Sequence, residues 1–222
     1  MSTSKKFLIA KNSFGDEINT AELVETAERV GLSGNLFRSY IIYKLSHEPN
    51  LISKTIERTD GKIGESLREV FKHDLEILFN AAKNVTTDLN FLKNYKPTIE
   101  NKSESFAELL SKLENLREVD EIADVFIEHY RKYGYGDIAD YRAFRFDEET
   151  KNLVGIKYFE SIKLDDLIGY AHQKELLTKN TNAFIDRKPA NNVLLVGARG
   201  TGKSSSVKAL VNENYKRGLR LV

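Results

Sequence analysis

Residues 197–204 read Gly-Ala-Arg-Gly-Thr-Gly-Lys-Ser, and this stretch decides the fold of the region around it. A glycine, four further residues and then Gly-Lys-Ser is the pattern of a loop that wraps phosphate groups. Glycine permits backbone angles and a close approach that a Cβ atom would forbid, so several N–H groups can turn toward one anion. Such a loop joins a buried strand to a helix. The apolar run Val193–Val196 predicts that strand, and the helix is predicted over 203–216.

Each polar side chain of the loop has an expected role. The Lys203 ammonium would reach the β- and γ-phosphates, and the Ser204 hydroxyl would bind Mg²⁺. The helix adds the positive end of its dipole. A chance glycine-rich loop is the alternative, and the flanking strand and helix patterns argue against it. The predicted nucleotide-binding residues of the loop are Gly197, Ala198, Arg199, Gly200, Thr201, Gly202, Lys203, Ser204 and Ser205.

The composition bounds the kinds of partner. The chain has 222 residues, with 34 Lys+Arg against 33 Asp+Glu and a net charge of +1, so no charge excess indicates nucleic acid or membrane as a partner. The chain has no cysteine, which excludes disulfides and thiolate metal sites and favours a reducing compartment. The apolar stretch Phe7 to Ala10 is too short for a signal-peptide core or a membrane span. We therefore expect a cytoplasmic protein.

Apolar residues at three-to-four spacing predict helices over residues 20–133. Within this region Ser105 and Glu108 suggest a capping box, and Gly134 suggests a left-handed helix stop. The runs 141–146 and 153–158, around a polar turn, predict a β-hairpin. The expected fold is α/β, mostly α in this chain. Its predicted parts are a helical N-terminal domain at 1–140, a β-hairpin connector at 141–160 and the start of a phosphate-binding domain at 161–222.

Leu164–Tyr170 resembles the entry segment of AAA+-type ATPases, in which an apolar residue and a glycine pack beside adenine. That resemblance implies that Ile168 and Gly169 line the base pocket and that the phosphate loop opens an AAA+-like parallel sheet. The chain is closer still to an uncharacterised bacterial family of AAA-like ATP-binding proteins, domain of unknown function 815. The residues that carry this likeness are Leu164–Tyr170, Asn180–Phe184, Pro189–Leu195, Gly197–Ser205, Gly218–Leu221, Gly134–Gly136 and Ala143–Phe146.

The family resemblance is specific from about residue 134 onward. It implies ATP and Mg²⁺ as cofactors and ATPase activity in the intact protein. Hydrolysis by this class also needs a strand ending in acidic residues, and no such run follows the loop before Val222. In the implied sheet, Val193–Val196 would lie between strands that come later, so both its edges would be unpaired. We therefore expect this sequence to be an N-terminal fragment that does not hydrolyse ATP by itself.

Three functions are compatible with the loop. The leading one is an AAA+-like ATPase that acts on an unknown protein partner or self-associates through its AAA+-like domain. The second is a nucleotide-gated interaction module without turnover. The third is a small-molecule P-loop kinase, a class whose loop usually opens the chain, whereas 196 residues precede Gly197.

Other features have simpler interpretations. Aromatic and basic residues alternate over 130–135 and 141–146 and could stack on single-stranded nucleic acid. A hairpin that packs its aromatic rings and exposes its arginines accounts for them better. Carboxylates at 118–124 are expected on a solvated helix face. The four histidines match no metal-ligand spacing and are expected on the surface or in the core. They are His47, His73, His129 and His172.

Overall fold

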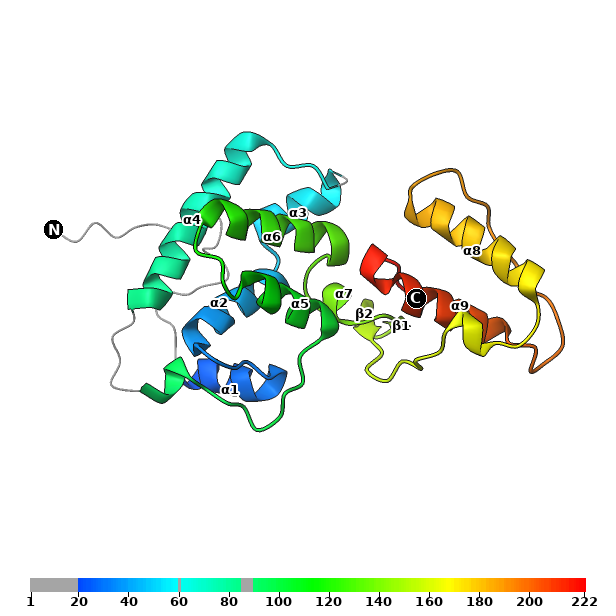
Figure 1. Cartoon of the computed structure of the whole chain (residues 1–222), viewed down its shortest axis with the longest axis horizontal. Coiled ribbons are helices and arrows are strands. Elements are labelled where there is room, and N and C mark those ends of the chain that lie inside the picture. The colour runs from blue at the N-terminus through cyan, green and yellow to red at the C-terminus, as the bar shows by residue number, and fades with distance from the viewer. Residues whose placement is uncertain (1–19, 60, 85–89) are drawn as a thin grey trace. The chain divides into compact units, whose positions relative to one another are not determined.

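A computed structural model describes residues 20–59, 61–84 and 90–222. The chain divides into two compact units, Met1–Asp140 and Tyr141–Val222. Figure 1 traces the first unit from blue to green and the second from yellow-green to red. Helices dominate both units, and the one sheet among the described residues is a two-stranded antiparallel hairpin. The mostly helical fold and the hairpin that the sequence predicts are confirmed.

The first unit is a bundle of helices around one apolar core. Helix α6 lies against α3, α4 and α5, and helix α2 lies against α1, α4 and α5. Phe71, Phe106 and Phe126 are among the largest fully buried side chains, and each contributes on the order of 2 kcal/mol through burial. The helices are α1 Thr20–Val30, α2 Leu36–His47, α3 Leu51–Arg58, α4 Glu65–Asn84, α5 Glu104–Leu113, α6 Val119–Tyr133 and α7 Asp137–Asp140, with a 3₁₀ turn η2 at Asn90–Lys93.

The capping box expected at Ser105 and Glu108 is wrong. The N-cap of α5 is Ser103, whose Oγ accepts a hydrogen bond from the backbone N–H of Phe106 at 3.2 Å. Glu108 is used instead for packing against α6, because its carboxylate accepts bonds from the Tyr133 hydroxyl at 2.5 Å and from Lys132 Nζ at 2.9 Å. Burial opposes ionisation of Glu108, but these bonds outweigh it and lower its pKa to about 2.

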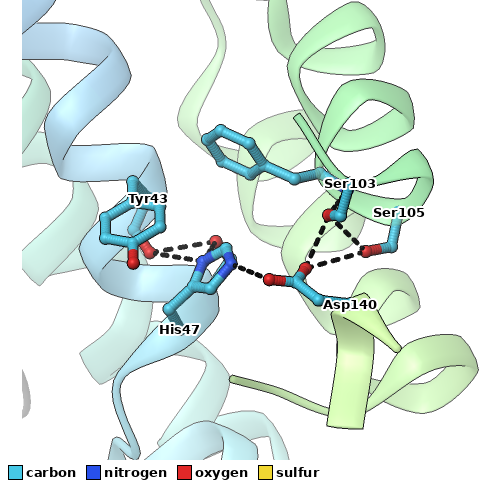
Figure 2. A network of polar contacts seen from close by, with 7 residues as sticks. Tyr43, His47, Ser103, Ser105 and Asp140 are labelled. Carbon is cyan, nitrogen blue, oxygen red and sulfur yellow. Dashed lines mark hydrogen bonds and ion pairs between the residues drawn. The ribbon is translucent and has the colours of Figure 1, made fainter. Parts of the chain in front are cut away.

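A partly buried polar network holds α7 to α2 and α5 (Figure 2). Asp140 Oδ1 accepts a hydrogen bond from Ser103 Oγ at 2.5 Å, and Asp140 Oδ2 lies 2.9 Å from His47 Nε2. The His47 ring also stacks on Tyr43, with ring centroids 4.1 Å apart. Burial alone would raise the pKa of Asp140, but the bonds from His47, Ser103 and Ser105 outweigh it and lower that pKa. His47 is therefore a structural residue of the core.

His129 lies on α6 and is only 6% exposed. Its Nε2 atom is buried and has no hydrogen-bond partner among the described residues. Burial, and secondarily the nearby His47, lowers the pKa of His129 to about 4. Since the folded unit disfavours the charged imidazole, folding of this unit is opposed by acid.

The second unit begins with the hairpin, in which β1 Phe144–Asp147 pairs with β2 Asn152–Gly155 and Phe144 is opposite Gly155. A Cβ atom on Gly155 would lie 2.2 Å from a ring carbon of Tyr141, so only glycine fits there. Leu221 adds a single parallel bridge to Ala143. Two helices follow the hairpin, together with two 3₁₀ turns. These elements are α8 Ala171–Ile185 and α9 Lys203–Asn214, with η3 at Leu164–Asp166 and η4 at Tyr215–Arg217.

The buried strand expected at Val193–Val196, and with it the start of the AAA+-like parallel sheet, is not formed. These residues form no strand and make no backbone hydrogen bond within the described part of the chain. Val193, Leu194 and Val196 are 52%, 86% and 84% exposed. A strand requires a neighbour to bond its N–H and C=O groups, and the described residues place none beside this run. Among those residues, no helix is long and apolar enough to cross a membrane.

We expect the substitution His129→Phe to remove an acid-sensitive part of the stability of the first unit. The folded-state pKa of about 4 lies below the usual 6.5, so the unfolded chain takes up the proton first as the pH falls. The stabilisation is complete above pH 6.5 and is lost progressively as the pH falls from 6.5 to about 4, by about 3 kcal/mol. Urea unfolding followed by circular dichroism at several pH values in this window measures it.

The control is His172→Phe, because His172 is exposed and its side chain makes no hydrogen bond or ion pair within the described residues. It should leave the pH dependence of unfolding unchanged. A His129→Phe variant that remains as acid-sensitive as the wild type would contradict the assignment.

Candidate functional site

The glycine-rich loop lies between the unpaired run 193–196 and the N-terminus of α9. Gly200 and Gly202 have φ values of 84° and 78°, a region that L-residues with side chains seldom adopt. Gly202 is the N-cap of α9 and its carbonyl accepts from the Ser206 N–H at 2.8 Å. Within the described chain, the N–H groups of residues 198–205 donate no hydrogen bond. These groups stand at the positive end of a helix dipole.

Lys203 is the first residue of α9, and its side chain turns back over the loop. Its Nζ donates to Gly197 O at 2.8 Å, to Ala198 O at 2.6 Å and to Thr201 Oγ1 at 3.3 Å. The Thr201 hydroxyl in turn donates to Ala198 O at 2.8 Å. The ammonium is therefore held within the loop by acceptors of the loop itself.

The remaining loop residues differ in exposure. Ala198, Arg199 and Ser204 are exposed, whereas Ser205 is half-buried. Ser206, which the sequence pattern does not single out, donates from its Oγ to Gly202 O at 2.9 Å and so ties the loop to the helix. The structure thus brings together the backbone amides, one ammonium and the exposed Ser204 hydroxyl that the pattern predicts.

The lead-in segment 160–167 is fastened to α9 and α8 by side chains that the sequence pattern does not mark. Asn212 Nδ2 donates to Glu160 O at 2.8 Å and to Ile162 O at 2.9 Å. On the other side, Lys174 Nζ donates to Leu167 O at 2.7 Å. Leu164 packs on Ala209 and Leu210 of α9 in a small apolar cluster. Only the three-dimensional packing of the two helices reveals these contacts.

This fastening brings the lead-in next to the loop. A Cβ atom on Gly202 would lie 3.9 Å from Leu167 Cδ2. Ile168 and Gly169 follow directly along the chain, with Ile168 97% exposed and Gly169 at φ 83°. The two residues expected at the base pocket therefore follow directly after a residue that approaches the loop, but neither lines the cavity beside it, and the Ile168 side chain is turned into solvent.

A cavity of about 800 Å³ adjoins the loop and is lined by Lys203 and Ser204. Most of its other walls are apolar side chains of α8, of α9 and of the extended residues around 193–195 and 219–221. Its charged lining residues are Lys203 and Arg220, and no carboxylate lines it. A second cavity of about 710 Å³ lies along α8 and contains none of the loop residues. The first cavity is therefore the one that adjoins the candidate phosphate-binding groups.

Two hydrogen bonds between Asn180 and Asn191 hold the residues just before the run 193–196 against α8. Asn180 Nδ2 donates to Asn191 O at 2.8 Å, and the Asn191 N–H donates to Asn180 Oδ1 at 2.9 Å. This pair of bonds imitates one bridge of a sheet, so the extended run leaves α8 in a fixed direction.

Residues 139–222 match the model of a family described as a protein of unknown function, DUF815. The match covers the last residues of the first unit and all of the second. No curated protein and no solved structure matches the chain. The description of the family names no activity.

We expect Asn212→Ala to release the lead-in segment, because it removes two side-chain bonds to that segment, worth on the order of 1 kcal/mol each, together with the bond that Asn212 Oδ1 accepts from Arg142. Trypsin cleavage after Lys157 and Lys163 should then become several-fold faster. Asn192→Ala is the control, since Asn192 is exposed and makes no hydrogen bond within the described residues. Equal cleavage rates in the two variants would show that Asn212 does not hold the segment.

Proposed function

We propose that the loop 197–205 binds ATP with Mg²⁺ and that the chain is part of an AAA+-like P-loop ATPase acting on a macromolecular partner. The proposal rests on the backbone N–H groups of residues 198–205, which donate no hydrogen bond within the described chain and lie beside the Lys203 ammonium. Backbone amides, a helix N-terminus and a fixed cation are together the complement of a chain of phosphate groups.

The residues fit such a ligand in type and in place. Gly200 and Gly202, both at positive φ, let the amides turn without a Cβ atom between them and an anion. Ser204 is exposed next to Lys203 and offers the small, hard oxygen that Mg²⁺ prefers. Leu167 lies against Gly202, and by the AAA+ resemblance the base would be met by Ile168 and Gly169.

Hydrolysis needs a carboxylate that holds the metal ion and orients water. The cavity beside the loop is lined by cations and apolar residues and by no carboxylate. The AAA+ resemblance supplies such carboxylates from a strand beside Val193–Val196. The backbone of that run makes no hydrogen bond within the described residues, and the run and residues 219–221 both line the cavity. We therefore propose that these 222 residues bind the nucleotide without turning it over.

The second candidate is a nucleotide-gated interaction module, in which binding alone changes the affinity for a partner. The observation that favours it is the apolar surface of the second unit, where Leu176 and Phe184 of α8 are 53% and 64% exposed. Exposed apolar surface of this kind marks sites of association. ATP turnover above background that is lost in Lys203→Ala would exclude this module.

We expect Lys203→Ala to weaken the binding of Mg-ATP by at least about a hundredfold, because the ammonium is the one cation held within the loop by its own acceptors. Calorimetric titration measures the affinity. Lys208→Ala is the charge-matched control, because Lys208 lies on the same helix and pairs with Glu160 instead. Unchanged affinity in Lys203→Ala would overturn the nucleotide site.

The 222-residue chain should release phosphate from ATP no faster than its own Lys203→Ala variant does. The physical reason is the lack of a carboxylate in the lining of the cavity. A coupled phosphate-release assay on both proteins makes the comparison. Turnover that is present in the wild type and lost in Lys203→Ala would show that the described residues already contain the hydrolytic groups.

A further inference from the structure

Thr201 occupies a position that the phosphate-loop pattern leaves open to any residue. In the structure its hydroxyl nevertheless bonds two other residues of the loop. Its hydroxyl donates to Ala198 O at 2.8 Å and accepts from Lys203 Nζ at 3.3 Å. A hydroxyl has one proton to donate and two lone pairs that accept. Thr201 therefore joins the beginning of the loop to the lysine at its end.

The three donors of the Lys203 ammonium match three acceptors of the loop. Two of the bonds, to Gly197 O and Ala198 O, measure 2.8 Å and 2.6 Å, whereas the bond to Thr201 Oγ1 measures 3.3 Å. Hydrogen bonds weaken with length. A phosphate oxygen that approaches the ammonium must replace one of the three acceptors, and Thr201 is the one given up at least cost.

Gly197 makes room for this arrangement. A Cβ atom on Gly197 would lie 3.2 Å from Thr201 Oγ1, closer than ordinary van der Waals contact. A side chain at position 197 would therefore press on the hydroxyl that Ala198 and Lys203 share. The first glycine of the motif thus has a second role, which is to leave space for the threonine.

We propose that Thr201 is a positioning residue. In the phosphate-free protein it keeps the third donor of Lys203 directed into the loop, and a phosphate oxygen then takes its place. Throughout the exchange the hydroxyl keeps its own bond to Ala198 O, so the loop does not open when the ammonium changes partner. This inference rests on the proposed phosphate site, and it adds the way in which the site is held ready before the ligand arrives.

The test compares Thr201→Val, which has the same shape without the hydroxyl, with Thr201→Ser, which keeps the hydroxyl. The first measurement is the ¹³C relaxation order parameter of the Lys203 Cε methylene in the phosphate-free chain. The second is the affinity for inorganic tripolyphosphate. Thr201→Val should lower the order parameter, and because it also removes the bond to Ala198 O that keeps the loop closed in the phosphate-bound state, it should weaken binding roughly five- to tenfold, whereas Thr201→Ser should behave as the wild type does.

Ser206→Ala is the matched control, because Ser206 also bonds a loop carbonyl, that of Gly202, without touching Lys203. It should leave the order of the lysine unchanged. The proposal is overturned if Thr201→Val keeps both the lysine order and the affinity, or if Thr201→Ser loses them as Thr201→Val does. Failure of the phosphate site itself is seen separately, as tripolyphosphate binding that Lys203→Ala does not alter, while the order parameter still reports on Thr201.

Discussion

The second unit depends on one helix, α9, and on the hydrogen-bonding demands of its N-terminal turn. Four N–H groups at the start of any helix lack partners within the helix, and here the preceding loop supplies none. The rest of α9 fixes what surrounds this end. Asn212 holds the lead-in segment, Leu210 packs on Leu164, and Lys208 pairs with Glu160. Packing along α9 therefore determines which segment lies beside the N-terminus of the helix. The geometry of the candidate site depends on that packing.

The first unit obeys a related rule, that buried polar groups must be paired. Among the partly buried groups, Asp140 is paired with His47 and Ser103, and Glu108 is paired with Lys132 and Tyr133. In both cases the bonds outweigh burial and keep the carboxylate ionised. Buried His129 is the exception, with Nε2 unpartnered. It is tolerated because a neutral imidazole costs far less to bury than a charged one, which makes the stability of the unit dependent on pH.

The local sequence pattern was sufficient to predict those features of the fold that depend on interactions between residues close together in the sequence. The helices, the hairpin and the position of the glycine-rich loop follow from apolar spacing and from the conformational freedom of glycine. The capping box at Ser105 failed because two serines, Ser103 and Ser105, compete for one helix end. The strand at Val193–Val196 failed because a strand depends on neighbours distant in the sequence. The contacts of Asn212, Lys174 and Thr201 could not be predicted, since nothing in a single sequence shows which carbonyl a polar side chain will meet.

The distinction between local and long-range contacts also applies to the two parts of the proposed function, nucleotide binding and hydrolysis. Every group proposed to hold phosphate belongs to one continuous stretch, 197–205, and the loop bonds that order it lie within ten residues. Such a site forms wherever α9 forms. A carboxylate that orients water must come from a different element, and in a parallel sheet that element reaches the loop only by pairing with the strand before it. The unpaired run Val193–Val196 is where that pairing would occur. On the proposed function, binding would therefore require local order alone, whereas hydrolysis would require the long-range order of a sheet.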